Sequence, residues 1–368
     1  METDVNTVLP PKRLKIFSDR RYLPEGRSHV TLLVPFWGKH REEFESLQGR
    51  RYDRYEEQGR SFFELTSLHE ADLAVLPADW EAGVRNHDLL FEFAEKAQRA
   101  GKPIVVFLWG MSFEQVPIEN AMVFRNSLLR SSHRRNELAV PFWMEDFVAE
   151  YLDGKLSVRE KSTKPKVGFC GFADPLHPSR SQQLIHLARE AQAILRGQTG
   201  QRGAGVVGRS IRTEALRALN RSAAVETNFI IRDRFWAGAV SPDGHADPDQ
   251  MRKVRLEYLR NMIDTDYNLC TRGAGNASFR LYETLCCGRI PVFIDTDAVL
   301  PYDFAADWKK YCVWIEQSEL PHIAAKVAEF HDRLSPTDFI DLQHRCRKFW
   351  EEWLSPEGFF AHFYLHFA

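Results

Sequence analysis

The chain contains 368 residues, of which 44% are hydrophobic and 27% are charged, and its formal net charge is -2. This length is too great for one ordinary core and fits two domains of about 150–200 residues each, and the composition is that of a soluble globular protein. Because the net charge is close to zero, a general role in coating polyanions is excluded, and we expect no nucleic-acid partner.

The cysteines and the N-terminus bear on the cellular location. The six cysteines form no C-x-x-C pair, which argues against a zinc site and against a disulfide framework. Residues 1–13 lack the apolar stretch of a signal peptide, and no apolar run reaches the roughly 18 residues of a transmembrane helix. We therefore expect reduced cysteines and a cytoplasmic protein, with peripheral contact to the inner face of a membrane as the alternative.

The first half of the chain alternates strand and helix patterns. Short apolar runs, several of which end at proline, predict buried parallel strands. These runs cover residues 14–17, 30–35, 72–77, 103–108, 121–124 and 138–141. A helix is expected from residue 85 to residue 99, followed by Gly101. Such alternation is typical of a doubly wound parallel sheet.

A second α/β half follows residues 153–166, a polar and basic segment whose composition is typical of a linker. Its expected strands are 166–171, 227–231, 266–270, 290–294 and 311–315. Its expected helices are 181–196, 210–221, 251–263, 319–333 and 337–353. We therefore assign residues 1–155 and 156–350 to two Rossmann-like domains.

The C-terminal segment, residues 351–368, is rich in aromatic side chains. We expect it to pack back on the body of the protein. The alternative is that its aromatic side chains contact a membrane surface. Those side chains are Phe359, Phe360, Phe363, Tyr364 and Phe367.

The stretch from residue 266 to residue 303 contains the clearest candidate site. A strand leads into a glycine-containing loop, and the loop opens a helix of about ten residues that a glycine ends. Parallel sheets bind anions at such a point, where a strand ends and a helix begins. The residues that suit an anionic ligand or cap the helix are Arg272, Gly273, Asn276, Ser278, Arg280 and Glu283. Glu283 either forms a surface ion pair with Arg280 or accepts a hydrogen bond from a ribose hydroxyl.

Two further motifs have competing interpretations. Residues 203–208 match G-x-G-x-x-G, but the expected strand does not directly precede them, so a dinucleotide site is disfavoured. We interpret them as a mobile loop, with Arg202, Arg209 and Arg212 beside it, that could close on a phosphate. Residues 264–266 and 295–297 match D-x-D, which holds a divalent metal in some sugar-nucleotide enzymes. Both follow or precede expected strands, so we interpret them as turns and expect no metal site.

Several motifs carry a family resemblance. Residues 278–292, SFRLYETLCCGRIPV, resemble the S-x-R-x-x-E-A-x-x-x-G-C-I-P-V stretch of exostosin-family glycosyltransferases (glycosyltransferase family 47). Residues 267–273, YNLCTRG, resemble that family's F-C-L-x-P-R-G, and residues 299–302, VLPY, resemble its x-L-P-F. Residues 70–77, EADLAVLP, are similar to its E-A-D-L-F-F-V-P. The motifs occur in the family's order.

The resemblance implies the GT-B fold, in which two Rossmann-like domains face each other across a cleft. Residues 1–155 would form the acceptor side, and residues 156–350 would bind the nucleotide-sugar. The implied reaction moves a sugar from a UDP- or GDP-sugar to a glycan or lipid-linked glycan, as in polysaccharide biosynthesis. It is implied to proceed with inversion and to require no metal or other cofactor.

Residue by residue, the resemblance places Arg272, Ser278, Arg280 and Glu283 in the donor-binding region, and Arg280 is also expected to act in catalysis. Three positions depart from the family pattern, and they leave the identity of the sugar open. They are Thr271 for proline, Thr284 for alanine and Arg289 for cysteine.

An inverting transfer needs a base for the acceptor proton and positive groups for the leaving diphosphate. Polar side chains at the expected strand ends of the first half are Asp19, His40, Asp79 and Glu145. Of these we select Asp79 and His40 as the candidate base. Arg209 or Arg232 would assist the leaving group.

Two other functions stay open from the sequence. One is a fucosyltransferase-like GT-B enzyme that uses a GDP-sugar. The other is a non-catalytic module that binds a nucleotide or glycan, which the presence of Arg272, Arg280 and Glu283 disfavours.

Overall fold

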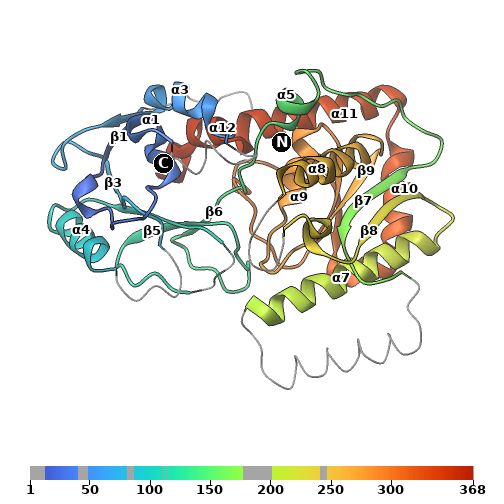
Figure 1. Ribbon diagram of the computed structural model, residues 1–368, viewed down its shortest axis with the longest axis horizontal. Coiled ribbons are helices and arrows are strands. Elements are labelled where there is room, and N and C mark those ends of the chain that lie inside the picture. The colour runs from blue at the N-terminus through green and yellow to red at the C-terminus, as the bar shows by residue number, and fades with distance from the viewer. Residues whose placement is uncertain are drawn as a thin grey trace, which may run out of the picture. The chain divides into compact units, whose positions relative to one another are not determined.

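The computed structural model describes residues 13–39, 49–80, 87–110, 112, 114–176, 201–240 and 247–367. They fall into two compact units (Figure 1). Unit 1 contains the described residues up to Glu145, together with Val299–Tyr302 and the C-terminal segment from Trp350. Unit 2 contains Asp146–Ala298 and Asp303–Phe349.

Unit 1 is built on a six-stranded parallel sheet with the order β2-β1-β3-β4-β5-β6. Its strands are β1 (Leu14–Phe17), β2 (Phe63–Leu65), β3 (Leu73–Val75), β4 (Ile104–Leu108), β5 (Ala121–Arg125) and β6 (Glu137–Ala139). Its helices include α1 (Val34–Trp37), α3 (Asp53–Phe62), α4 (Asp88–Arg99) and α12 (Pro356–Ala361). The strand order reverses direction between β1 and β3, so polar residues that follow these strands gather at one edge.

The expected strand at residues 30–35 is wrong. The segment forms a 3-10 turn, Thr31–Leu33, followed by α1. A short apolar run predicts burial, but its periodicity does not separate a strand from a buried helical segment. Pro35 lies in the first turn of α1, where a missing N–H costs no helical hydrogen bond. The short strand β2 was not anticipated.

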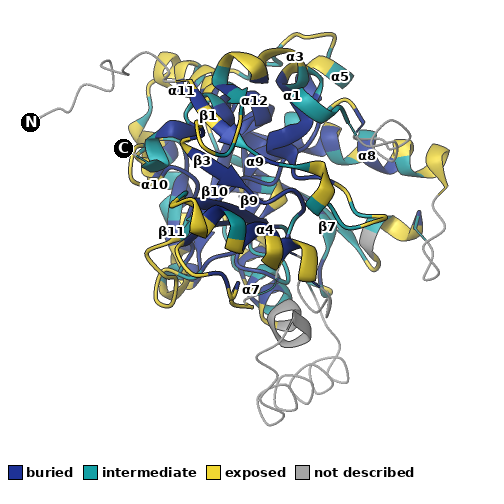
Figure 2. Ribbon diagram, turned by 90° about the vertical axis from the view of Figure 1, so that its left-hand side faces the viewer, coloured by how far each residue is buried: buried dark blue, intermediate teal, exposed yellow. Residues whose placement is uncertain are grey.

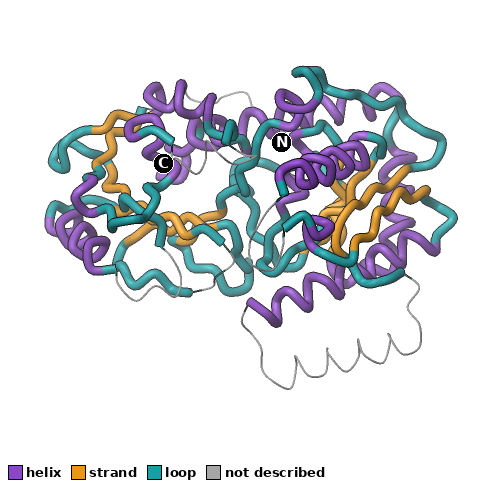
Figure 3. The backbone as a smooth tube through the Cα atoms, viewed as in Figure 1, coloured by secondary structure: helices purple, strands orange, loops and turns teal. Residues whose placement is uncertain are grey.

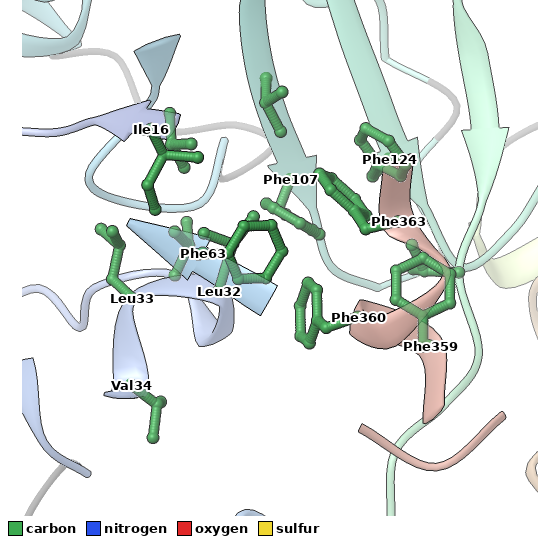
Figure 4. Packing of buried hydrophobic residues seen from close by; sticks show 14 of the residues in the cluster. Ile16, Leu32, Leu33, Val34, Phe63, Phe107, Phe124, Phe359, Phe360 and Phe363 are labelled. Atoms are coloured by element: carbon green, nitrogen blue, oxygen red, sulfur yellow. The ribbon is translucent and has the colours of Figure 1, made fainter. Parts of the chain in front are cut away.

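The C-terminal segment belongs to the core of unit 1 (Figure 4). Phe360 stacks on Tyr55 with ring centroids 4.5 Å apart, and Phe363 lies 4.8 Å from Phe124. Phe359, Phe360 and Phe363 are at most 1% exposed. These three side chains are therefore not available to a membrane surface, and that alternative is wrong for them.

Unit 2 is built on a five-stranded parallel sheet with the order β11-β10-β9-β7-β8. Its strands are β7 (Lys166–Phe172), β8 (Glu226–Arg232), β9 (Tyr267–Cys270), β10 (Ile290–Asp295) and β11 (Val313–Glu316). Its helices include α5 (Phe147–Tyr151), α7 (Gln201–Arg221), α8 (Pro248–Ile263), α9 (Phe279–Cys286), α10 (Ile323–Arg333) and α11 (Pro336–Phe349). Helices cover both faces, with α7 on one face and α8 on the other (Figure 1).

Each unit is thus a parallel sheet with flanking helices, and the strands form two separate groups (Figure 3). Strands such as β3, β9 and β10 are buried, whereas the helices expose their outer faces (Figure 2). The predicted α/β class with two Rossmann-like domains, the domain composition of GT-B, is confirmed. Among the described residues, no helix combines the length and apolar character needed to cross a membrane. The expected helix at residues 181–196 lies outside the described part of the chain.

Residues 153–166 are not a free linker, because they pack into unit 2. Arg289, which is fully buried, donates hydrogen bonds to the carbonyl oxygens of Ser157 and Ile263. Asp266 is also fully buried and accepts from Arg159 Nε at 2.8 Å and from Ser162 Oγ at 2.7 Å. The polar residues that suggested a linker therefore satisfy buried charges.

The boundary between the units lies at Glu145–Asp146, whereas the sequence placed it at residue 155. Asp146 caps the N-terminus of α5, where its carboxylate accepts from the backbone N–H of Val148. The same carboxylate forms an ion pair with Arg347 at 2.7 Å. Burial alone would raise the pKa of Asp146, but the hydrogen bond and charge of Arg347 outweigh the effect of burial and lower it. These two contacts attach residues 146–155 to unit 2.

The C-terminal segment makes the stability of the protein depend on pH through His366. Both ring nitrogens are buried, and the ring stacks on Tyr302. Burial lowers the pKa of His366 to about 3. The unfolded chain takes up a proton below pH 6.5 while the folded chain does not, so stability falls as the pH falls from 6.5 towards 3.

We expect the free energy of unfolding to decrease by about 2 kcal/mol through His366 between pH 7 and pH 5. Chemical denaturation at both pH values would measure it, with His366→Phe as the comparison because phenylalanine does not titrate. A wild-type pH slope equal to that of His366→Phe would contradict this account.

Candidate functional site

The strand order of unit 2 predicts where a ligand binds. The chain runs from β7 to β8 on one side and then places β9 on the other side of β7. Strands β7 and β9 are parallel neighbours, with Val167 beside Tyr267. In open parallel sheets, ligands bind beyond the carboxyl ends of the strands at such a reversal. The loop at residues 271–278 begins at this point, directly after β9.

The loop is compact and leads into helix α9. The backbone N–H of Gly273 donates to the carbonyl oxygen of Ala277 at 3.0 Å. Ser278 occupies the N-cap position of α9, but its side chain makes no capping hydrogen bond. Asn276 accepts a hydrogen bond from Thr296, which follows β10. The expected capping hydrogen bond of Ser278 is therefore not seen, and a capping role of Asn276 stays a prediction.

Arg212 of helix α7 holds this loop against the end of β7. Its Nε donates to Thr271 Oγ1 at 3.0 Å, and its Nη2 donates to the carbonyl oxygen of Arg272 at 3.1 Å. Its Nη1 donates to the carbonyl oxygen of Phe172 at 2.9 Å. One guanidinium thus joins the carboxyl ends of both strands at the reversal.

The G-x-G-x-x-G segment is part of helix α7, so its interpretation as a mobile loop is wrong. Its last glycine, Gly208, explains why glycine is needed in a helix at this place. A Cβ atom on Gly208 would lie 2.2 Å from the carbonyl oxygen of Gly273. The missing side chain lets α7 approach the loop closely enough for Arg212 to bind it.

Arg272 is the side chain of the loop that is best suited to bind an anionic ligand. Its Nε is buried and has no hydrogen-bond partner among the residues that the structure describes. Burial lowers the pKa of Arg272, and no carboxylate in the described part of the chain offsets this effect. A buried donor without an acceptor costs about 1–3 kcal/mol, which an anionic ligand would recover.

Arg280 extends from the first turn of α9 back to β7. Its guanidinium lies over the ring of Phe169, with 4.2 Å between Cζ and the ring centroid, and its Nη2 donates to the carbonyl oxygen of Cys170 at 2.7 Å. Burial opposes the charge of Arg280, but the side chains of Tyr258, Cys270 and Glu283 outweigh burial and raise its pKa. Arg280 therefore stays charged.

Glu283 does not form the surface ion pair with Arg280 that was one interpretation of the sequence. It is buried, and its carboxylate accepts hydrogen bonds from Tyr258 Oη and from Arg255 Nη1, the latter at 3.3 Å. Both partners lie on helix α8. Acceptance from a ribose hydroxyl stays a prediction.

The site carries an excess of positive charge. Arg212, Arg272 and Arg280 form no ion pair with any residue that the structure describes, whereas Arg209 lies 3.7 Å from Asp174. Burial, followed by repulsion from Arg280 and Arg209, lowers the pKa of Arg212 to about 10. Ionisable groups that shift one another's pKa values are typical of functional sites. Here the excess of positive charge favours the binding of an anion.

Arg232, the remaining arginine expected to assist the leaving group, already binds a carboxylate of unit 2. It ends β8 and donates to the Glu257 carboxylate at 2.6 Å. Sequence reasoning missed Arg255 and Tyr258 as neighbours of the site, because no motif spacing links helix α8 to α9.

The base candidates lie in unit 1. Asp79 follows β3 at the strand reversal, and its carbonyl oxygen accepts from Arg27 at 2.6 Å. Asp19 follows β1, but its carboxylate binds Arg21, whose hydrogen bond lowers the pKa of Asp19. Glu145 is only 1% exposed, so its carboxylate is not accessible to the hydroxyl group of an acceptor substrate. His40 lies outside the described residues.

Comparison with known proteins gives the family. The model of the Exostosin GT47 domain matches residues 204–329, a range that includes the whole loop and the four arginines. This part of the chain is similar to an exostosin GT47 domain. The resemblance seen in the sequence is thereby confirmed for this part of the chain.

Two curated proteins show the same relationship. Exostosin-1 of Drosophila melanogaster is 25% identical over 111 residues, which are 30% of this chain and 14% of that protein. A probable glycosyltransferase of Arabidopsis thaliana is 31% identical over 68 residues, which are 18% of this chain and 14% of that protein. The similarity to either relative thus covers far less than two thirds of its length.

The close approach of α7 can be tested with Gly208→Ala. Alanine favours a helix by up to about 1 kcal/mol over glycine, but here its Cβ would collide with the carbonyl of Gly273. We therefore expect Gly208→Ala to destabilise the protein by about 1–3 kcal/mol. Chemical denaturation would measure this, with Val207→Ala as control because Val207 is 47% exposed on the same helix. Stabilisation by Gly208→Ala would show that α7 does not need to approach the loop.

Proposed function

We propose that this chain is a glycosyltransferase that binds the diphosphate of a nucleotide-sugar at the arginine cluster of unit 2. The observation that carries the proposal is the buried Arg272 Nε, which has no acceptor among the described residues and lies in the loop that follows β9 at the strand reversal. A diphosphate offers several charged acceptor oxygens, which match guanidinium donors. The exostosin GT47 match over the same residues supports this choice of ligand.

The proposed reaction replaces the bond between the anomeric carbon and the diphosphate oxygen by a bond to an acceptor hydroxyl oxygen, with inversion. Negative charge then develops on the leaving diphosphate. We propose that Arg272 and Arg280 stabilise this charge. Fixed cations of this kind stabilise the negative charge of the leaving diphosphate, as a divalent ion does in other enzymes. We therefore propose that no metal is required.

The acceptor hydroxyl must lose its proton as the new bond forms. We propose Asp79 as the base, because it follows β3 at the strand reversal of unit 1, whereas the carboxylate of Asp19 caps a 3-10 helix. A glycan hydroxyl is the proposed acceptor, in keeping with the family. The nucleotide base and the sugar remain to be found by screening UDP- and GDP-sugars.

Arg272→Met tests the role of the cluster. Removing one donor to a developing anion typically costs about 100- to 1,000-fold in rate, so we expect a loss of this size in transfer. The fold should persist, because the variant removes a buried charge that has no acidic partner among the described residues. Transfer from the nucleotide-sugar that the screen identifies and thermal unfolding are the measurements.

Arg260→Met is the matched control, since Arg260 is an exposed arginine in the last turn of α8, at the opposite end of the sheet. It should keep wild-type activity. Full activity in Arg272→Met, or an equal loss in both variants, would overturn the assignment of the donor site.

A further inference from the structure

Two helices of unit 2 present matched pairs of side chains to each other. Helix α8 carries Arg255 and Tyr258, and helix α9 carries Arg280 and Glu283. Residues three positions apart lie on the same face of a helix. The four side chains therefore meet between α8 and α9. Figure 1 shows these two helices in unit 2.

Tyr258 contacts both charged residues of α9. Its ring lies 5.3 Å from the Cζ of Arg280, and the ring of Phe169 lies 4.2 Å from the same atom. The guanidinium is thus held by two aromatic rings, a contact that contributes about 0.5–2 kcal/mol when it is shielded from water. The hydroxyl of Tyr258 donates to Glu283 Oε2. One side chain therefore orients a cation with its ring and an anion with its hydroxyl.

Glu283 is held from a second direction by Arg255. The ion pair measures 3.3 Å, and both side chains are at most 10% exposed. Arg255 itself lies over the rings of Trp236 and Phe147, at 4.8 Å and 5.1 Å. Because each carboxylate oxygen has a fixed donor, Glu283 keeps one orientation and retains further lone pairs for a ligand.

The phenol remains a donor under ordinary conditions. Burial, followed by the charge of Glu283, raises the pKa of Tyr258 well above its usual value. The Glu283 carboxylate therefore faces a neutral O–H group. Arg255 and Arg280 are the charged groups that face this pair from α8 and α9.

We propose that Tyr258 is a positioning residue of the donor site, whose ring sets the direction of Arg280 and whose hydroxyl sets that of Glu283. The inference rests on the proposed function. It assigns two separable effects to one side chain. Arg280 acts on the leaving diphosphate, where charge develops during reaction, so its orientation affects kcat. Glu283 would bind the ribose, which does not change during reaction, so its orientation affects KM.

Two substitutions separate these effects. Tyr258→Phe keeps the ring and removes only the hydroxyl, so we expect KM for the nucleotide-sugar to rise about tenfold while kcat stays within about threefold. Tyr258→Leu removes the ring as well, so we expect kcat to fall at least thirtyfold and KM to rise. The measurement is steady-state kinetics of the whole chain, normalised to the folded fraction.

Tyr267→Phe provides a matched control. It also removes a buried phenol hydrogen bond in unit 2, the 3.0 Å contact with His331, which touches neither Arg280 nor Glu283. This variant should lose stability like Tyr258→Phe but keep both kinetic constants. A role of Tyr258 in stability alone would instead make the two phenylalanine variants behave alike.

Binding of UDP and GDP to the wild-type chain, measured by calorimetry, distinguishes a failure of the positioning role from a failure of the proposed function. If a nucleotide binds and transfer occurs, but Tyr258→Phe and Tyr258→Leu change kcat and KM in equal proportion, the positioning role is overturned and the proposed function stands. If the wild type binds neither nucleotide and transfers no sugar, the proposed function falls, and the positioning role falls with it.

Discussion

The candidate site depends on one buried guanidinium that joins two strands. Arg212 reaches from α7 to the backbone at the end of β7 and to both Thr271 and Arg272 after β9. Its three donors satisfy backbone and hydroxyl oxygens, so its positive charge is hydrogen-bonded without being neutralised. The loop that follows is therefore held in place by a cation, which also lies close enough to Arg280 for their charges to repel each other. Gly208 makes this arrangement possible, because only a helix without a side chain there can come so close.

The arginines of unit 2 divide into two groups by their partners. Arg159, Arg255 and Arg347 each bind a buried or half-buried carboxylate, and these pairs join segments far apart in the sequence. Among the described residues, Arg212 and Arg280 donate to backbone or hydroxyl oxygens, the buried Nε of Arg272 has no acceptor, and none of the three forms an ion pair with a carboxylate. Burial of charge without a counter-ion is costly to a folded protein. Buried positive charges of this kind are concentrated at the strand reversal, where they suit the anionic donor that we propose as the ligand.

Much of this organisation could be predicted from the sequence, and the exceptions have physical causes. Continuous apolar runs located β4 and β10, and the glycine after α9 located the end of that helix, where Gly288 has φ +60°. Residues 30–35 were assigned to the wrong element, because complete burial removes the alternation that separates strand from helix. The glycines at 203–208 suggested a loop, although Gly208 serves a close helix contact. The partners of Glu283 could not be predicted, because the packing of α8 on α9 decides them.

The central claim is that arginines, and not a divalent ion, hold the diphosphate of the donor. Calorimetric titration of the whole chain with UDP and with GDP in the presence of EDTA tests it directly. The account predicts that at least one of them binds without metal and that its affinity falls as salt concentration rises, because salt screens the charges. Binding of neither nucleotide in EDTA, with binding restored by Mg²⁺ or Mn²⁺, would contradict the account.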